Sequence, residues 1–180
     1  MPVSGVRLAR ASDVDGIAEV NVRSWRLRFD GVVPAAVLAD MDASDVAMVW
    51  ASGILNPPTT LHRLLVAVDD AAVVGYAAIG PGADPDTDPG TVELLALEVD
   101  PDRTRQGHGS RLMSAAIDHA RAAGMTSATV WCPLLDEARR SFLQSAGWAP
   151  DTAFRDLAVG AGSDGTETLL REVRLVTSLD

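Results

Sequence analysis

The chain contains no lysine and a single cysteine, and these two scarcities narrow its chemistry. Phosphate-binding P-loops and Schiff-base enzymes both depend on a lysine, so both classes are excluded. Cys132 alone cannot form a disulfide within the chain, which favours a reducing compartment. No apolar run approaches the ~20 residues of a membrane span, and the first residues lack the pattern of a signal peptide. We therefore expect a cytoplasmic protein with no membrane partner.

Basic side chains are scarce as well, with 15 of them against 25 acidic ones and a formal charge of -10. Nucleic acids and anionic membrane surfaces are bound by basic patches, so neither is an expected partner. The acidity suits a cationic substrate, and it suits equally a protein that uses charge only to stay soluble. With 180 residues, 47% of them apolar and 22% charged, the composition predicts one globular domain over residues 1–180.

Metal-ligand patterns are missing too. The three histidines and Cys132 do not have the spacing of a zinc site. The loop from Asp84 to Gly90 has the alternating aspartates of a calcium loop, but its proline and glycine fall one place off. The twelfth residue of that loop is Leu95 instead of glutamate. We expect no metal.

Apolar periodicity and turn residues divide the chain into strands and helices. Strands are predicted over residues 7–8, 63–68, 73–79, 92–99, 129–132, 154–157 and 169–176. Helices are predicted over residues 14–26, 35–50, 109–123 and 136–146. Strands run together early and then alternate with helices, which is typical of a mixed α/β fold. The pattern predicts about six to seven strands and about four helices.

A loop rich in glycine and arginine links the strand that ends at Val99 to the helix that follows. It reads Arg-Gln-Gly-His-Gly-Ser over residues 105–110, and further arginines stand at positions 103 and 111. Amides at a helix N-terminus are unpaired and partially positive, and a glycine without a Cβ lets an anion approach them. A pyrophosphate fits this loop. The glycine spacing alone fits a structural turn equally well.

The segment from Val99 to Met113, VDPDRTRQGHGSRLM, resembles motif A of the GNAT superfamily of N-acetyltransferases, (R/Q)-x-x-G-x-(G/A). Its Arg-Gln-Gly-x-Gly core is especially similar to ribosomal-protein alanine N-acetyltransferases. Residues 138–148, ARRSFLQSAGW, are similar to the family's motif B, N-x-x-A/S-x-x-F-Y-x-x-x-G-F. Ser24-Trp25-Arg26, followed by Gly31, Pro34 and Leu38, resembles a common opening of the family. The order of elements fits from Val6 to Val176.

The resemblance implies a largely antiparallel sheet that splays near its middle, between the strands that contain Leu97 and Trp131. It implies an acetyl-CoA-dependent enzyme that acetylates a primary amine of a small molecule or a protein by direct attack. The pantetheine arm would pair with the backbone of Leu97, Glu98 and Val99. The pyrophosphate would bind the amides of Arg105, Gln106, Gly107, His108, Gly109 and Ser110. Homodimers are common in the family, which leaves a homodimer as an open expectation.

Acetyl transfer needs a neutral amine, and deprotonating an amine with a pKa near 10.4 costs about 4.6 kcal/mol at pH 7. A carboxylate can accept the proton directly or through a water. Glu93 is the preferred base because it aligns with the catalytic glutamate of histone-acetyltransferase-like members. Strand alternation also predicts that Glu93 shares a face with Leu97 and that Glu98, a structural or solvated residue, lies on the other face. The alternatives are a solvent-facing Glu93 and a water chain in its place.

The first helices form the acceptor wall in this family. The resemblance therefore implies that Trp25 and Asp30 bind the acceptor and that Trp131 lines the acetyl channel. Plain packing is the alternative for all three. His108 fills the variable position of motif A, and we expect a loop residue there and not a catalyst.

Four residues depart from the family pattern. Thr104 replaces the arginine or glutamine that opens motif A, and Leu143 stands where many members have a tyrosine that protonates the leaving thiolate. A thiol with a pKa near 8.5 needs little help to leave. In motif B, Asp136 replaces the usual asparagine and Arg139 a small residue. These departures keep a second hypothesis open, an acyl-CoA-binding sensor with a GNAT fold and little turnover.

Overall fold

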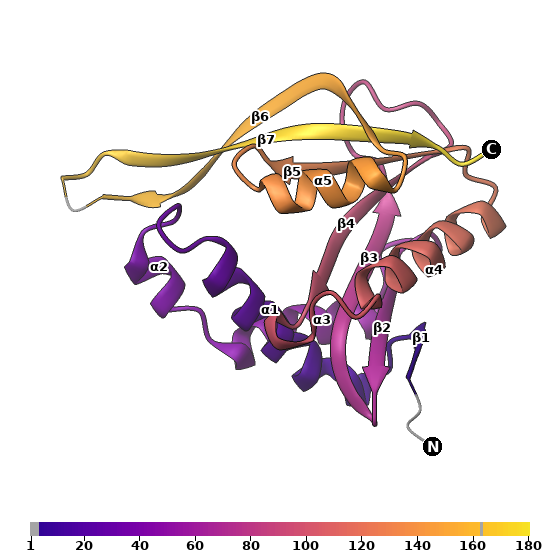
Figure 1. Cartoon of the computed structure of the whole chain (residues 1–180), viewed down its shortest axis with the longest axis horizontal. Helices are drawn as coiled ribbons and strands as arrows, with labels where there is room; N and C mark the ends of the chain where they lie inside the picture. The colour runs from indigo at the N-terminus through magenta and orange to yellow at the C-terminus, as the bar shows by residue number, and fades with distance from the viewer. Residues whose placement is uncertain (1–3, 163) are drawn as a thin grey trace.

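The computed structural model of the chain describes residues 4–162 and 164–180. Its seven strands form one sheet in the order β1-β2-β3-β4-β5-β7-β6, with five α-helices around it (Figure 1). Every pair of neighbouring strands is antiparallel except β4 and β5, which are parallel. The predicted mixed α/β class and the largely antiparallel sheet are confirmed.

The strands are β1 (Gly5–Leu8), β2 (Arg63–Asp69), β3 (Ala72–Pro81), β4 (Thr91–Val99), β5 (Ser127–Pro133), β6 (Ala149–Ala161) and β7 (Glu167–Ser178). The helices are α1 (Val14–Arg28), α2 (Ala35–Ala39), α3 (Ala43–Leu55), α4 (His108–Ala122) and α5 (Glu137–Ser145). Two short 3-10 helices, η1 (Ala11–Asp13) and η2 (Pro101–Arg103), precede α1 and α4. In the part of the chain that the structure describes, no helix has the length and apolarity to cross a membrane.

Helices cover both faces of the sheet, and each face has its own apolar core (Figure 1). On one face, Leu112 of α4 and Leu143 of α5 are fully buried against the sheet. On the other face, Ile17 of α1 packs with Tyr76 of β3 and with Trp50 of α3. Burying a side chain of this size contributes about 1.5–3 kcal/mol. The two cores therefore hold α4 and α1 in fixed positions on opposite sides of β4.

The sheet splays open between β4 and β5, as predicted. These strands pair only where Thr91–Glu93 meets Ser127–Thr129, at the start of each strand. Beyond Glu93 the two strands diverge, and β5 continues its pairing with β7 alone (Figure 1). Among the described residues, the second half of β4 therefore has a backbone edge with no strand partner.

Strand β4 also contains a β-bulge. Leu94 pairs with Ile79 of β3 and Ala96 pairs with Ala78, so Leu95 has no partner. One extra residue in a strand reverses the alternation of side chains beyond it. Leu95 is consequently 48% exposed, although its neighbour Leu94 is buried.

The bulge overturns the predicted faces of the β4 residues. Leu94 and Leu97 are three residues apart, yet both belong to the core under α4. Glu93 pairs with Gly80 and Glu98 with Tyr76, positions of β3 that are four residues apart and share a face. The prediction that Glu93 shares a face with Leu97 and opposes Glu98 is therefore wrong. Glu93 and Glu98 both face the α1 side.

The segment predicted as one helix over residues 35–50 forms two helices. Helix α2 ends at Ala39 and α3 begins at Ala43. The Asp42 side chain accepts a hydrogen bond from the Ser44 amide at 2.7 Å, an N-cap that starts α3 afresh. Met41 continues the apolar pattern across the break, which explains why periodicity alone merges the two helices.

Strands β6 and β7 form a long hairpin that extends toward α2 (Figure 1). Strand β6 starts at Ala149, five residues before the predicted Phe154. The sequence did not indicate this early start, because most side chains of this edge strand are exposed and its apolar alternation is weak. Val159 and Leu170 of the hairpin pack with Leu38 of α2 in a third apolar cluster. The hairpin therefore adds a wall to the α1 side of the sheet.

Candidate active site

The loop between β4 and α4 leaves a row of backbone amides unpaired. Gly107 caps α4 with a φ of +80°, a left-handed conformation that favours glycine. The Arg111 amide donates to the Gly107 carbonyl at 3.1 Å, and within the described residues the amides of residues 107–110 donate no hydrogen bond. Such amides carry the partial positive charge of a helix N-terminus. They can bind an anion.

Gly109 keeps the space in front of these amides free. A Cβ at this position would lie 3.7 Å from Phe142 and from Val99, which is ordinary contact distance. The fold would therefore accept a side chain at Gly109. A side chain at this position would reduce the room next to the amides.

His108 is the first residue of α4 and is 3% exposed, so the prediction of a loop residue is wrong. The helix begins one residue earlier than predicted, because Gly107 supplies the left-handed cap. Arg111 lies 2.9 Å from His108 Nδ1, whereas Nε2 has no hydrogen-bond partner in the described part of the chain. Burial lowers the pKa of His108, and the charge of Arg111 lowers it further. Both effects favour the neutral imidazole.

A cavity of about 860 Å³, here called the loop cavity, lies in front of the α4 N-terminus. Its walls are the loop, η2, the end of α1 and one side of α5. The predicted CoA-binding residues that line it are Val99, Arg105, Gly107, His108, Gly109 and Ser110. The predicted residues Leu97, Glu98 and Gln106 are not among its lining residues.

A buried cluster of charges closes the inner end of the loop cavity. Glu98 is 4% exposed and accepts hydrogen bonds from Arg28 at both carboxylate oxygens. Arg28 Nε lies 3.3 Å from Asp136 Oδ2. Arg139 Nη1 lies 3.7 Å from Glu98 Oε1 and donates to the Leu97 carbonyl at 2.8 Å. Two guanidinium groups thus face two carboxylates, and the Glu98 cluster has no net charge.

A second cavity of about 450 Å³, here called the aromatic cavity, lies on the α1 side of the sheet. Arg28 and Arg139 line both cavities, so the two meet at the Glu98 cluster. The predicted acceptor residues Trp25 and Trp131 both line it, from α1 and from β5. Asp30 is exposed and is not among its lining residues. The structure thus brings the two tryptophans together and leaves the aspartate outside.

Glu93 is buried and is not among the lining residues of the aromatic cavity, although Glu172, which lines that cavity, is one of the charges that act on it. Burial raises the pKa of Glu93, the negative charge of Asp84 raises it further, and Arg155 opposes both effects. The Arg155 guanidinium stacks 4.4 Å from the ring of Trp131, whose Nε1 donates to Asp84 at 3.2 Å. Asp84 also accepts a hydrogen bond from Arg174 at 3.1 Å. An arginine therefore anchors the start of the loop from Asp84 to Gly90.

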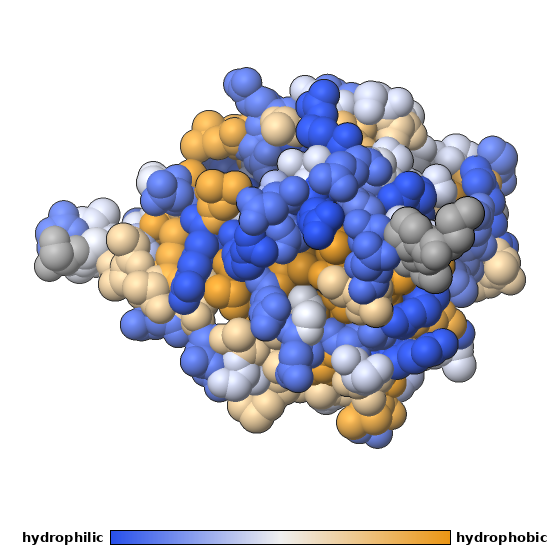
Figure 2. Space-filling view, turned by 60° about the horizontal axis from the view of Figure 1, so that its bottom comes forward, coloured by the Kyte–Doolittle hydropathy of each residue, from blue (hydrophilic) through white to orange (hydrophobic). Residues whose placement is uncertain are grey.

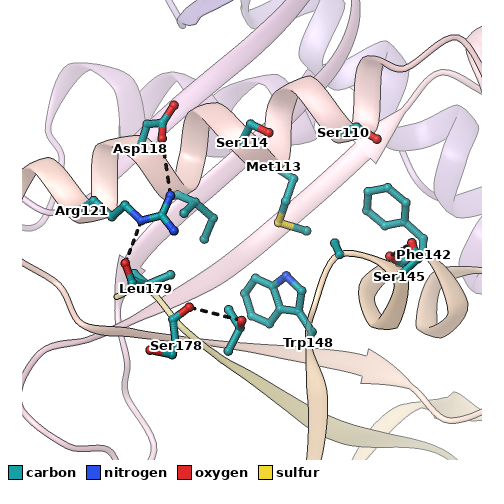
Figure 3. A pocket seen from close by; sticks show the side chains of 13 residues that line it. Ser110, Met113, Ser114, Asp118, Arg121, Phe142, Ser145, Trp148, Ser178 and Leu179 are labelled. Carbon is teal, nitrogen blue, oxygen red and sulfur yellow. Dashed lines mark hydrogen bonds and ion pairs between the residues drawn. The ribbon is translucent and has the colours of Figure 1, made fainter.

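A third cavity, a cleft of about 500 Å³, runs between α4, α5 and the end of β7 (Figure 3). Figure 3 shows Arg121 on α4, which lies 3.8 Å from Asp118 and donates to the Leu179 carbonyl at 2.8 Å. Ser110, Phe142 and Ser145 line both this cleft and the loop cavity. The cleft therefore continues the loop cavity along α4 and α5.

Two lining residues escaped the sequence reasoning. Arg28 lines both cavities, and its only sequence signal is that it follows Trp25 by three residues on the same helix face. Phe142 lines the loop cavity, whereas Leu143, which takes the place of the family's tyrosine, is fully buried in the core. Tyr76, expected as packing, is also a lining residue of the aromatic cavity.

Comparison with known proteins points to one family. Residues 36–148 match the acetyltransferase (GNAT) family. The chain is also similar to a protein of Bacillus subtilis (strain 168) described as the uncharacterized N-acetyltransferase YuaI. The two are 29% identical over 127 residues, which cover 70% of this chain and 69% of that protein.

Solved structures share the fold over almost the whole chain. One is the PaiA N-acetyltransferase of Thermoplasma acidophilum in complex with coenzyme A, with a TM-score of 0.73, 16% identity, and coverage of 94% of this chain and 98% of that one. Another is YncA of Salmonella typhimurium with its cofactor acetyl-CoA, with a TM-score of 0.69, 22% identity, and coverage of 98% and 94%. At such identities the likeness establishes the fold alone.

Proposed function

The chain belongs to the GNAT family of acetyltransferases, and on that basis we propose that it transfers the acetyl group of acetyl-CoA directly to a primary amine. The observation that carries the proposal is the row of unpaired amides over residues 107–110, next to an edge of β4 that pairs with no other strand of the described residues. Similar structures that hold CoA or acetyl-CoA support it. Residues 1–180 would then form one acetyltransferase domain.

The loop cavity suits the diphosphate of acetyl-CoA. The amides of residues 105–110 would hold the phosphate oxygens, and Gly107 and Gly109 place no side chain in the way. Arg103 and Arg105 line the cavity and are exposed, so they can pair with phosphate. When bound, acetyl-CoA supplies the reactive thioester.

The free edge of β4 suits the pantetheine arm. The Asp100 amide donates to the Val74 carbonyl of β3 at 2.9 Å, so by strand alternation the amides of Leu97 and Val99 face the opposite gap. The Leu97 carbonyl faces the same gap, because Arg139 reaches it there. An extended arm that pairs with the backbone of residues 97–99 would take the place of the missing strand. Arg139 would then release the Leu97 carbonyl.

The acceptor amine would approach from the aromatic cavity. Its nitrogen attacks the acetyl carbon, the carbon–sulfur bond breaks, and the amine proton passes to a carboxylate. Amides of β4 that face the gap can donate to the carbonyl oxygen as negative charge develops there. The thiol leaves as a thiolate with a pKa near 8.5 and needs no dedicated acid.

Glu93 is the proposed base, acting through a water. Because of the bulge at Leu95, its side chain faces the acceptor side of the sheet and not the core under α4. Burial and the neighbouring Asp84 raise the pKa of Glu93, which makes its carboxylate a stronger base. Trp25 and Trp131 would hold the acceptor.

The alternative, an acyl-CoA sensor with little turnover, has less support from the structure. The sensor hypothesis relied partly on Leu143, which stands in place of the family's tyrosine. Leu143 is buried in the core, and Phe142 lines the loop cavity instead. A second cavity that meets the first at the Glu98 cluster is expected of a two-substrate enzyme. A protein that only binds acyl-CoA needs no second cavity for an acceptor.

A thermal-shift screen with acetyl-CoA, CoA and longer acyl-CoAs tests the proposal without a guess about the acceptor. We expect acetyl-CoA to raise the melting temperature in a concentration-dependent way. Thiol release over a panel of amines then separates the two hypotheses, because a sensor would be stabilised without acetylating any amine. If no CoA thioester stabilised the protein at millimolar concentration, both hypotheses would fail.

A further inference from the structure

Aromatic side chains are concentrated around one cavity. The chain has only eight aromatic residues, and five of them line the aromatic cavity. They come from the C-terminal end of α1, from α3, from β3 and from β5: Trp25, Phe29, Trp50, Tyr76 and Trp131. Trp25 meets Phe29 at 5.2 Å and Trp50 meets Tyr76 at 5.0 Å, both with edge-to-face geometry. The cavity therefore offers ring faces and edges to a guest.

The remaining wall is largely aliphatic and stays open to solvent. It is formed by α2, the bulged Leu95 and the distal part of the β6–β7 hairpin. Figure 2 shows apolar surface beside the projecting hairpin on the face it draws. Trp25 is 40% exposed and Leu157 38%, so these lining residues are accessible to a small molecule. A volume of about 450 Å³ lies within the range of small-molecule sites, about 300–1,000 Å³.

The charged groups of this cavity are already paired. Arg28 uses two nitrogens on Glu98 and its third beside Asp136. A carboxylate on the acceptor would have to displace Glu98 to gain Arg28, and the other arginine, Arg139, already lies 3.7 Å from the same carboxylate. Glu172, which also lines the cavity, accepts a hydrogen bond from Arg155 at 2.7 Å. A second ammonium on the acceptor would have to lie against apolar walls, which is costly without a free partner.

The orientation of a guest follows from where the two cavities meet. Only the end at Arg28 and Arg139 borders the loop cavity, so the reactive nitrogen has to lie at that end. The rest of the molecule then extends between the aromatic residues. We infer that the acceptor is a small primary amine on a ring-bearing apolar body, with no second charge. This inference rests on the proposed acetyl transfer and adds its substrate class.

Matched amines test the inference. With acetyl-CoA saturating, kcat/KM for 2-phenylethylamine should exceed that for ethylamine by roughly 10- to 100-fold, because the ring buries apolar surface. Phenylalanine adds a carboxylate, spermidine adds charges, and a lysine peptide adds a polar chain. Each should be a poorer substrate than 2-phenylethylamine. A preference for any of the three would overturn the inference.

Matched variants tie the preference to the cavity. Trp25→Ala should reduce the ring preference about tenfold and leave stabilisation by acetyl-CoA unchanged. Leu157→Gln, at the rim, should reduce it as well. Leu169→Gln is the control, because Leu169 lies on the same hairpin, is exposed and does not line the cavity. Equal ring preference in Trp25→Ala, Leu157→Gln and the unmodified protein would overturn the inference.

A binding readout separates this inference from the proposed function. Three of the four tryptophans line the cavity and Trp148 does not, so 2-cyclohexylethylamine should change the tryptophan emission. Stabilisation by acetyl-CoA with no emission change and no acetylation of ring-bearing amines would refute the substrate class alone. Absence of any acetyl-CoA binding would refute the transferase and the substrate class together.

Discussion

The loop cavity and the aromatic cavity share a wall at the Glu98 cluster but are built in opposite ways. The loop cavity takes its proposed anion-binding groups from one stretch of backbone, residues 105–110, where the glycines leave room because they have no side chain. The aromatic cavity takes its five rings from positions spread between Trp25 and Trp131, brought together by the sheet and its covering helices.

This difference separates the proposed binding of acetyl-CoA, which depends on the backbone, from the proposed selection of the acceptor, which depends on side chains. A site made of main-chain amides needs only a turn and a helix, so many side chains can change without loss of the ligand. A site made of side chains from distant elements depends on the packing of the whole fold. We therefore expect substitutions in residues 105–110 to change the binding of acetyl-CoA and substitutions in the aromatic cavity to change the binding of the acceptor.

The largest effect should come from Glu93→Gln. If Glu93 accepts the amine proton, kcat should fall by about 10²- to 10⁴-fold. Stabilisation by acetyl-CoA should not change, because Glu93 does not line the loop cavity. Glu137→Gln, on the exposed surface of α5, is the control for steady-state kinetics. A Glu93→Gln enzyme with nearly full kcat would remove Glu93 from the mechanism.

The next largest effect should come from the wall between the two cavities. Glu98→Gln leaves Arg28 and Arg139 without their buried carboxylate and should lower the free energy of unfolding by about 3 kcal/mol. Urea denaturation measures this loss, with the exposed Glu167→Gln as the control. A loss below about 1 kcal/mol would mean that the cluster does not hold the wall together.

A pair of glycine substitutions tests the loop alone. Gly107 and Gly124 have φ values of +80° and +78°, and a Cβ at either position would meet no atom closer than 3.9 Å. Each change to alanine should cost about 1 kcal/mol of stability through backbone strain. Only Gly107→Ala should raise the KM for acetyl-CoA, by about tenfold. Equal KM values in the two variants would speak against the amide site.

The smallest effect should be a shift in pH dependence. The charge of Asp84 raises the pKa of Glu93, so Asp84→Asn should lower that pKa. Glu93 would then stay ionised to lower pH, and the acidic limb of the kcat/KM profile should move to lower pH. Asp88→Asn, in the same loop but exposed, is the control. An acidic limb that stays in place would mean that Glu93 does not set it.

The same contrast explains what the sequence could predict. Residues 105–110 could be predicted as a loop at a helix N-terminus, because glycine, arginine and the start of the helix lie next to each other in the chain. The faces of Glu93 and Glu98 were predicted wrongly, since the bulge at Leu95 exists only in the pairing of β4 with β3. Sequence alternation contains no sign of it.

Long-range packing accounts for the other gaps. Arg28 was not singled out, because its role depends on Glu98, which lies 70 positions further along the chain. The break between α2 and α3 depends on a cap at Asp42 inside a continuous apolar pattern. Asp30 was predicted because the first helices form the acceptor wall in the family, but the chain beyond the end of α1 places it outside the cavity.

The most direct test of the account is nuclear magnetic resonance of protein labelled with ¹⁵N only at glycine. Addition of acetyl-CoA should shift the amide signals of Gly107 and Gly109, which lie at the unpaired start of α4. The signals of Gly124 and Gly165, in turns outside the loop cavity, should stay in place. Saturation with acetyl-CoA that leaves the Gly107 and Gly109 signals unmoved would contradict the binding of its diphosphate by these amides.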